Sequence, residues 1–201
     1  MIIGLSGKAQ AGKDTVGAYL VEAHGFKRLS FAQALKDLAV AVDPVVGSWR
    51  DDEVPNNLQL DPLAGLVADD GWDDAKTYPE VRRFLQNLGQ GIRDLDPEFW
   101  IRQIQKQLVA QMNEQQTLGP HVVITDVRYR NEADWIRQCG YVWRIERKDA
   151  GLDGDAASHP SENDLNDYKF DGTIGNHTTI SDLHQLVDSA LEGLWARDSA
   201  L

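Results

Sequence analysis

The sequence predicts one α/β domain built on a parallel sheet, and three of its features carry that prediction. The apolar run at 1–6 has the composition of a buried parallel strand, and a glycine-bounded loop and a helical pattern over 16–23 follow it. A second apolar run, 121–126, has the same composition and ends on an aspartate. A length of 201 residues fits one domain that buries a sizeable core.

Composition narrows the classes of protein to which the chain can belong. A hydrophobic fraction of 42% and a charged fraction of 26% are ordinary for a soluble globular protein. The net charge of −12 argues against nucleic acid or an anionic membrane as a partner, so an anionic ligand needs clustered Lys and Arg. The single cysteine, Cys139, cannot form an internal disulfide, and the sequence holds neither a membrane-spanning run nor room for a signal peptide. We therefore expect a cytoplasmic protein.

The loop at 7–15 reads Gly-Lys-Ala-Gln-Ala-Gly-Lys-Asp-Thr and predicts a nucleotide-binding site. Between a strand and a helix, the backbone N–H groups of such a loop and the positive helix N-terminus bind polyphosphate. Gly7 and Gly12 let the backbone approach the phosphates, and Lys13 supplies a charge for the β- and γ-phosphates. Asp14 stands where a hydroxyl that binds magnesium is expected, and Thr15 comes one residue later. The alternative is a glycine turn before a helix, with Asp14 stabilising the helix N-terminus.

The segment after the first helix leads away from the predicted sheet. A weaker strand is expected at 26–31, and a helix with one apolar face at 32–42. Residues 43–76 are acidic and interrupted by proline and glycine. We interpret them as an excursion with short helical pieces that serves mostly as a solvated connection.

A helix is expected at 77–95, with Thr77 as its N-cap. At about 100° per residue, one narrow stripe of this helix collects polar and small residues. The members of the stripe are Arg82, Gln86, Gly89 and Arg93. Two arginines and an amide offer bidentate contacts to a phosphate and a hydrogen bond to a base edge. The alternative is an ordinary solvated helix face.

The second half of the chain alternates helices with strands. A helix is expected at 97–115 with Asp96 as its N-cap, followed by the strand at 121–126. Because ligands collect at the carboxyl ends of parallel strands, we expect Asp126 beside the 7–15 loop, where it can hold Mg²⁺ through water. The remaining elements are a helix that stops near Gly140, a strand at 141–145, a polar segment at 149–167 suited to a lid, a strand at 172–176 and a helix capped by Ser181.

Short motifs spread over nearly the entire chain carry a family resemblance. They are Gly-Leu-Ser-Gly at 4–7, Ala-Gly-Lys-Asp-Thr at 11–15, Ser-Phe-Ala at 30–32 with Leu-Lys at 35–36, Arg82 with Leu85-Gln86, Gly89 and Arg93, Asp126-Val127-Arg128 with Asn131-Glu132-Ala133, His159 with Ser161-Glu162, and the stretch 171–176 before a terminal helix. In this order they resemble the deoxynucleoside monophosphate kinases encoded by bacteriophages, within the P-loop kinase superfamily. Gly-Lys-Asp-Thr is typical of that family, so Asp14 supports the resemblance.

The resemblance implies a three-layer α/β fold with a five-stranded parallel sheet, helices on both faces, and the strands at 1–6 and 121–126 as neighbours. It implies transfer of the γ-phosphoryl group of ATP to the 5′-phosphate of a deoxynucleotide, with Mg²⁺, for DNA precursor synthesis. No general base is needed, because the attacking phosphate oxygen is already anionic. The implied division is a single domain over 1–201, with a core at 1–42, 116–147 and 168–201, an acceptor-binding region at about 43–115 and a lid at about 148–167.

The resemblance also gives individual residues their expected roles. The catalytic residues are Lys13, Arg128 and Arg147. ATP is expected to bind Gly7, Ala11, Gly12, Lys13, Asp14, Thr15 and Asn176. The acceptor is expected to bind Lys36, Arg82, Gln86 and Arg93, and magnesium to bind Asp126 and Asp14, partly through water. The expected partners are these small molecules in the host cytoplasm, and homodimerisation is left open.

Two other interpretations are left open. A P-loop kinase for another acceptor, dephospho-coenzyme A or phosphomevalonate, shares the loop, the lid and the terminal strand and helix. The stripe on the 77–95 helix favours a nucleotide over these acceptors. A switch or assembly protein regulated by ATP or GTP belongs to a different class. The sequence has no guanine-reading Asn-Lys-x-Asp motif, and its acidic surface gives no sign of a large partner.

Overall fold

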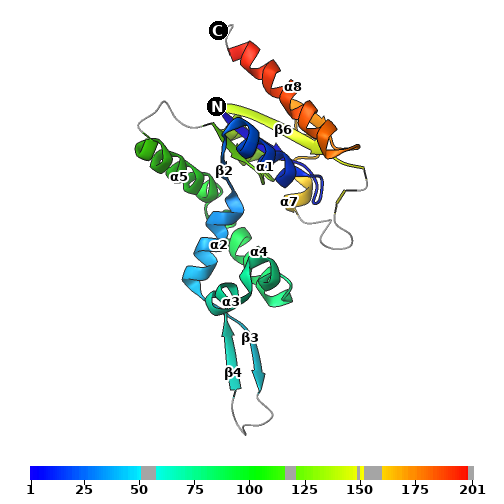
Figure 1. Cartoon of the computed structure of the whole chain (residues 1–201). Coiled ribbons are helices and arrows are strands. Elements are labelled where there is room, and N and C mark those ends of the chain that lie inside the picture. Colours follow the sequence, from blue (N-terminus) through cyan, green and yellow to red (C-terminus); the bar gives the residue numbers. More distant parts are fainter. Residues whose placement is uncertain (51–57, 116–120, 149, 152–159, 199–201) are drawn as a thin grey trace. The chain divides into compact units, whose positions relative to one another are not determined.

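The computed structural model describes residues 1–50, 58–115, 121–148, 150–151 and 160–198 (Figure 1). Within it the chain forms two compact units, one of residues 1–31 and 104–201 and the other of residues 32–103. The predicted division into core, acceptor-binding region and lid stays a prediction. No helix among the described residues is long and apolar enough to cross a membrane.

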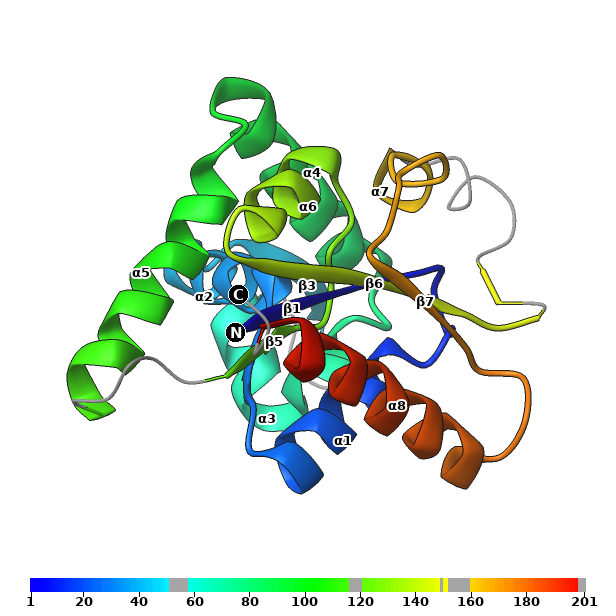
Figure 2. The ribbon, with the colours of Figure 1, turned by 90° about the horizontal axis from the view of Figure 1, so that it is seen from above.

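A five-stranded parallel sheet is the centre of the first unit (Figure 2). Its strands are β1 (Ile2–Ser6), β2 (Lys27–Leu29), β5 (Val122–Ile124), β6 (Gly140–Glu146) and β7 (Gly172–Gly175), in the order β2-β5-β1-β6-β7. β1 pairs in parallel with β5 on one side and with β6 on the other. The five parallel strands and the pairing of β1 with β5 confirm the sequence-based expectation.

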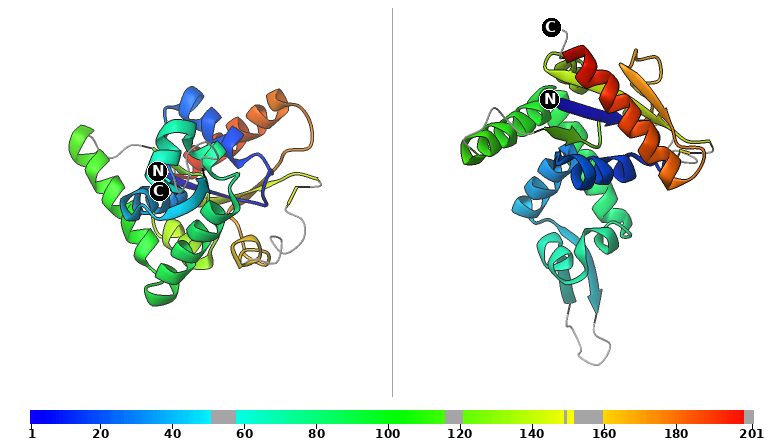
Figure 3. Two further views of the ribbon diagram at one scale, coloured as in Figure 1. Left: turned by 90° about the horizontal axis from the view of Figure 1, so that it is seen from below. Right: turned by 45° about the horizontal axis from the view of Figure 1, so that its top comes forward.

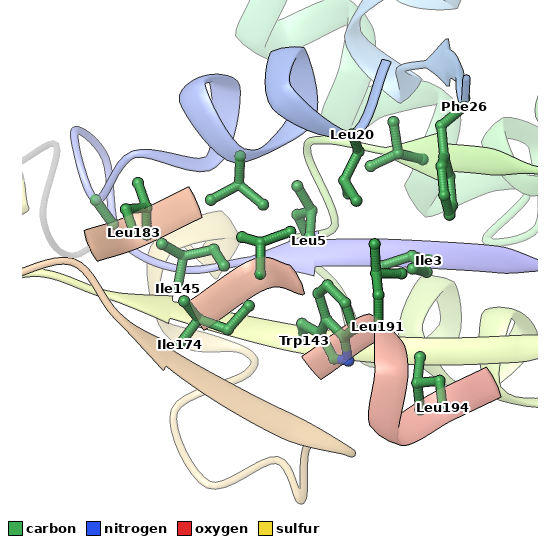
Figure 4. Close-up of a cluster of buried hydrophobic side chains, with 14 residues drawn as sticks. Ile3, Leu5, Leu20, Phe26, Trp143, Ile145, Ile174, Leu183, Leu191 and Leu194 are labelled. Atoms are coloured by element: carbon green, nitrogen blue, oxygen red, sulfur yellow. The ribbon is translucent and has the colours of Figure 1, made fainter. Parts of the chain in front are cut away.

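Helices cover both faces of this sheet, which gives the predicted three layers. The helix α1 (Lys13–His24) and the helix α8 (Ile180–Asp198) lie on one face, and α6 (Arg130–Arg137) lies on the other. Ile3 and Leu5 of β1 point toward Leu20 and Leu191 in the main core (Figure 4). On the opposite face, a Cβ added to Gly4 would lie 2.8 Å from Cδ1 of Ile136 in α6. Glycine therefore lets α6 pack directly on β1.

The second unit contains a β-hairpin and three helices (Figure 3). Its elements are α2 (Phe31–Val42), the antiparallel strands β3 (Val45–Arg50) and β4 (Leu58–Pro62), α3 (Leu63–Ala75) and α4 (Pro79–Leu95). Ala39, Val46, Leu63 and Val81 form a buried core, and Phe84, Leu85 and Leu88 of α4 pack against it. The helix α5 (Phe99–Gln115) contains the boundary between the two units.

The prediction that residues 43–76 contain short helical pieces is confirmed, but the interpretation of most of this stretch as a solvated connection was wrong. Apart from 51–57, which lie outside the described residues, it contains the paired strands β3 and β4 and the helix α3, which Gly71 (φ 77°) divides into two short helical pieces. Val46 and Leu63, which are 17 residues apart in the sequence, are both buried. Pairing of the two strands is what brings these separated apolar residues onto one core, and a local pattern does not reveal it.

The helix boundaries differ from the predicted ones at three caps. Tyr78, rather than Thr77, is the N-cap of α4, and the Thr77 hydroxyl instead donates to the Asp74 carbonyl after α3. Asp96 closes α4 through its N–H and pairs with Arg102 through its carboxylate, so α5 begins only at Phe99. The helix α8 begins at Ile180 after a reciprocal pair of hydrogen bonds between Thr179 and Asp182, each 3.2 Å long, which displaces Ser181 as the predicted cap.

A cluster of polar aromatic groups joins α1 to α8. The carboxylate of Asp188 accepts hydrogen bonds from the Tyr19 hydroxyl at 2.9 Å and lies 2.8 Å from Nε2 of His24. The ring of His184 stacks on Tyr19 with the centroids 3.8 Å apart. The Tyr19 hydrogen bond, with a smaller contribution from His24, holds the pKa of Asp188 below its usual range.

The stability of the α1–α8 contact should therefore depend on pH. A carboxyl group with a lowered pKa in the folded state stabilises the fold above its unfolded pKa of about 3.8 and loses that effect as the pH falls through the folded pKa. We expect Asp188→Asn to lower the melting temperature at pH 7 and to flatten its decline below pH 4. Glu192→Gln, on the same helix, is the control and should change neither. Equal melting curves for Asp188→Asn and the unmodified chain from pH 7 to pH 3 would contradict this assignment.

Candidate functional site

The 7–15 loop connects β1 to α1 and contains two glycines at positions where a side chain would not fit. Gly7 has φ 144° and Gly12 has φ 102°, both in the region that favours glycine. A Cβ added to Gly7 would lie 2.3 Å from the carbonyl oxygen of Ile145, and one added to Gly12 would lie 2.4 Å from Nδ2 of Asn176. The ends of two neighbouring strands therefore determine the path of the loop. An ordinary glycine turn before a helix would not need these close contacts.

Asn176, predicted to bind ATP, lies directly against the 7–15 loop. Its side-chain amide donates to the carbonyl of Ala11 at 3.0 Å, and its own N–H donates to Glu146 at 2.6 Å. The carboxyl end of β7 is thereby tied both to the loop and to the end of β6. The structure thus gives Asn176 a contact that shapes the loop, and its binding to ATP stays a prediction.

Lys13 is buried at the start of α1, with 8% of its surface exposed. Its ammonium group turns back over the loop and donates to the carbonyls of Gly7 and Lys8, both at 2.8 Å. Burial lowers the pKa of Lys13, and the charge of Arg128 lowers it further. The acidic groups nearby, first Glu162 and then Asp14 and Asp126, oppose that shift. An anion bound in the loop would favour the charged ammonium in the same way.

Arg128 follows β5 and lies at the same edge of the sheet as the loop. Its guanidinium forms an ion pair with Glu162, a residue of α7 (Pro160–Asn163). Its backbone N–H donates to Glu132 at 2.9 Å. Because 39% of the Arg128 side chain stays exposed, the guanidinium keeps a surface that a further anion can contact.

Asp126 lies beyond the carboxyl end of β5 with its carboxylate fixed in place. The Ser30 hydroxyl and the Phe31 N–H each donate to one of its oxygens at 2.9 Å. In the described parts of the chain, no three His, Cys, Asp or Glu side chains gather as a metal cage would need. Mg²⁺ commonly binds one or two carboxylates together with phosphate oxygens and water. The single oriented carboxylate of Asp126 is compatible with such a site.

Asp14 and Thr15 are both exposed in the first turn of α1. The Asp14 carboxylate forms an ion pair with Arg28 of β2, whose Nε also donates to Thr125 at 3.2 Å. The sequence reasoning missed Arg28. Its ion pair gives Asp14 a contact that competes with the predicted contact to magnesium.

A cavity of about 550 Å³ opens beside the loop, and Arg147 contributes to its wall. It is lined by Lys8, Ala11, Arg144, Ile145, Glu146, Arg147, Lys148, Ala150 and His177. The sequence reasoning placed Ala11 and Arg147 in the site but missed Lys8, Arg144, Lys148 and His177. Two of these residues could have been found from the sequence. Lys8 lies inside the glycine loop, and Lys148 follows the carboxyl end of a predicted strand.

The four predicted acceptor residues all belong to the second unit. Arg82, Gln86 and Arg93 lie on α4, with Arg82 and Gln86 exposed and Arg93 half-buried. Nε of Arg82 donates to the Lys76 carbonyl, and the ammonium of Lys36 lies 5.2 Å from the centre of the Trp72 ring. The expected apolar flank of α4 does pack on the core, and Gly89 of the stripe approaches Leu35, where an added Cβ would lie 3.3 Å from Cδ2. Whether the stripe binds an acceptor stays a prediction.

The predicted lid at 148–167 is described in part. Residue 149 and residues 152–159, including His159, lie outside the described residues. The remainder contains α7, and Glu162 and Leu165 are buried. The ammonium of Lys8 donates to the Glu162 carbonyl at 2.5 Å, which ties α7 to the 7–15 loop. Closure of this segment over a ligand stays a prediction.

Comparison with known proteins identifies the group of proteins to which the chain is similar. The profile of the deoxynucleotide monophosphate kinase family matches residues 69–187, more than half of the chain. A protein of Acanthamoeba polyphaga mimivirus with the provisional name deoxynucleotide monophosphate kinase is 29% identical over 96% of both chains. An uncharacterised protein, ORF77 of Ictalurid herpesvirus 1 (strain Auburn), is 32% identical over 56% of this chain and 49% of its own length.

A solved structure shows the same fold. The dephospho-CoA kinase from Campylobacter jejuni superposes with a TM-score of 0.53 over 96% of both chains, at 16% identity. Together with the strand order described above, this likeness confirms the predicted P-loop kinase fold. An identity this low concerns the fold and leaves the acceptor open.

The steric role of Gly12 can be separated from its backbone strain. Gly25 also has a positive φ, but a Cβ added there meets nothing within 4 Å. Gly25→Ala should therefore lower the free energy of unfolding by about 1–2 kcal/mol and leave ATP binding unchanged. Gly12→Ala should also displace Asn176 and weaken ATP binding at least about tenfold, the equivalent of one lost hydrogen bond. Chemical denaturation and calorimetric titration with ATP measure both quantities, and equal ATP affinity in the two variants would refute the steric role.

Proposed function

The chain belongs to the deoxynucleotide monophosphate kinase family, and from this we propose that it transfers the γ-phosphoryl group of ATP to the 5′-phosphate of a deoxynucleoside monophosphate. The products are ADP and a deoxynucleoside diphosphate, a precursor for DNA synthesis. The observation that carries the proposal is the buried ammonium of Lys13 over a loop that excludes side chains at Gly7 and Gly12. A buried cation at the N-terminus of a helix is suited to a polyphosphate.

The donor ATP is proposed to occupy the 7–15 loop and the adjoining cavity. The loop, including Ala11, Asp14 and Thr15, takes the phosphates through its N–H groups and the N-terminus of α1. A cavity of about 550 Å³ has room for a nucleoside. Arg147 lines this cavity, and Asn176 contacts the loop. The basic residues there supply the local positive charge that a chain of net charge −12 needs to hold ATP.

Catalysis on this site consists of positioning and charge neutralisation. A phosphate oxygen of the acceptor attacks the γ-phosphorus of ATP, while the bond from that phosphorus to the β-bridging oxygen breaks and ADP leaves. Lys13 neutralises charge on the β- and γ-phosphates, and Arg128 and Arg147 are proposed to neutralise charge on the transferred group. The acceptor oxygen is already anionic, so no side chain has to remove a proton.

Mg²⁺ is proposed as the cofactor, with Asp126 as its principal protein group. When bound, the ion would neutralise negative charge on the phosphates. Ser30 and Phe31 orient the Asp126 carboxylate through their 2.9 Å hydrogen bonds. Asp14, paired with Arg28, is proposed to act through water.

The acceptor is proposed to bind the second unit through Lys36, Arg82, Gln86 and Arg93. A guanidinium makes two parallel hydrogen bonds to a phosphate, and an amide can pair with a base edge. We propose that these small molecules are the partners and that the host cytoplasm is the location. Membership of the kinase family favours this function over an NTP-regulated switch. The dephospho-CoA kinase likeness concerns the fold and adds no support for that acceptor.

Lys13→Ala should remove most phosphoryl transfer while the fold survives, because its buried ammonium is the charge proposed to contact the β- and γ-phosphates. Lys27→Ala is the matched control, since Lys27 is exposed on β2. A coupled assay with ATP and each deoxynucleoside monophosphate in turn measures the rates, and circular dichroism checks the fold. Turnover of Lys13→Ala near that of the unmodified chain would reject the proposed function.

Arg93→Lys keeps the charge but loses the planar fork, so it should raise the Michaelis constant for the acceptor. A lost charge-assisted hydrogen bond of about 1.5–3 kcal/mol corresponds to an increase of about ten- to a hundred-fold. The constant for ATP should change much less. Arg83→Lys, which lies off the stripe and pairs with Glu80, is the control. Steady-state kinetics with each substrate varied in turn decides the matter: equal changes in both constants mean a structural stripe, and no change means a solvated helix face.

A further inference from the structure

Glu162 on α7 contacts the phosphate site twice. Its carboxylate, with 4% of the side chain exposed, forms the ion pair with Arg128. Its backbone carbonyl accepts the hydrogen bond of 2.5 Å from the ammonium of Lys8. Asn163 Oδ1 lies 3.4 Å from the same ammonium. One short helix is thus bound both to the 7–15 loop and to the residue that follows β5.

A buried ion pair of this kind is better explained by a role in positioning than by stability. Removing a carboxylate from water costs free energy, and its attraction to the partner often does no more than offset that cost. The pair is also asymmetric, because Glu162 is buried while 39% of the Arg128 side chain is exposed. A buried carboxylate holds one side of the guanidinium and leaves donors of Arg128 for another anion.

The charges around the loop need a fixed anion before any ligand arrives. A small cavity of about 20 Å³ is lined by Gly7, Lys8, Arg128, Arg144 and Glu162 among others, and Glu162 is the acidic residue in that lining. Lys13 lies close enough for Arg128 to lower its pKa and for Glu162 to raise it. Without Glu162, fewer carboxylates would oppose the mutual repulsion of the cations Lys8, Lys13 and Arg128, with Asp14 and Asp126 remaining near Lys13.

We propose that Glu162 is a positioning residue for phosphoryl transfer: it aligns Arg128 and holds the loop cations together before the polyphosphate binds. This inference rests on the proposed kinase function for its rate effects. It assigns a task to a residue of the predicted lid that the site prediction did not include. Glu162 itself touches neither substrate nor the transferred group.

Other contacts hold the same segment in place, so a substitution at Glu162 can be tested in a folded protein. The backbone N–H of Arg130 donates to Asp164 at 2.7 Å, and the Arg130 guanidinium pairs with Asp167. Glu162→Gln keeps the shape and one acceptor oxygen of the side chain while removing its charge. Asp167→Asn is the matched control, because it removes an exposed ion pair of the same segment away from the loop.

We expect Glu162→Gln to lower kcat about ten- to a hundred-fold, since a misplaced charge group loses orientation in the transition state. Asp167→Asn should leave kcat unchanged. A purely structural Glu162 would lower the melting temperature without lowering kcat in the folded protein.

A binding experiment gives a readout that needs no turnover. Calorimetric titration with ATP is carried out on Glu162→Gln, Arg128→Met and the double variant, with melting temperatures recorded for each. If Glu162 acts through Arg128, its substitution weakens ATP binding about five- to tenfold alone and has no further effect in the Arg128→Met background. Losses that simply add, or an unchanged affinity in Glu162→Gln, would overturn the inference. Absence of phosphoryl transfer by the unmodified chain would instead overturn the proposed function and leave this binding test to decide the role of Glu162.

Discussion

The close approach of the 7–15 loop to two strand ends is the constraint on which the site depends. The carbonyl of Ile145 occupies the space of a Gly7 side chain, and the amide of Asn176 occupies that of a Gly12 side chain. The loop is therefore shaped by β6 and β7, whose carboxyl ends lie beside it in a parallel sheet. The strand order β2-β5-β1-β6-β7 also brings Asp126 and Arg128 to that edge from the other side of β1. Parallel pairing is what makes five sequence-distant segments share one edge.

Positive charge is concentrated around the 7–15 loop although the chain as a whole is acidic. The chain carries a net charge of −12, yet Lys8, Lys13 and Arg128 gather around one loop. Burial lowers the pKa of Lys13, which means that the charged ammonium is destabilised there and that a nearby anion would stabilise it. Glu162, Asp14 and Asp126 supply fixed negative charge nearby. A polyphosphate is the ligand proposed for this loop, because the N-terminus of a helix favours negative charge.

The two units divide the proposed work between them. The first holds the loop, the cation cluster and the oriented carboxylate of Asp126, and its core is the cluster of Ile3, Leu5 and their neighbours under α1 and α8. The second has a separate small core around Val46, Leu63 and Val81, from which α4 projects its polar stripe. The kinase family match begins at residue 69 and so includes that stripe. Because a fold does not by itself determine the acceptor, the proposed acceptor role of the second unit depends on the residues of its own stripe.

The sequence by itself determined the strand, loop and helix at the start of the chain, the strand before Asp126 and the apolar flank of α4. Each of these follows from residues within one element, where periodicity and glycine spacing act locally. Tertiary structure alone decided the hairpin in 43–76, the true helix caps and the contacts of Lys8, Arg28, Arg144 and Glu162. Lys8 and Glu162 are 154 residues apart, and the local sequence around either residue does not predict its contact with the other. Such pairs come into contact only when the order of the strands and the path of the connections are settled, because that order, rather than local propensity, sets which strand ends meet.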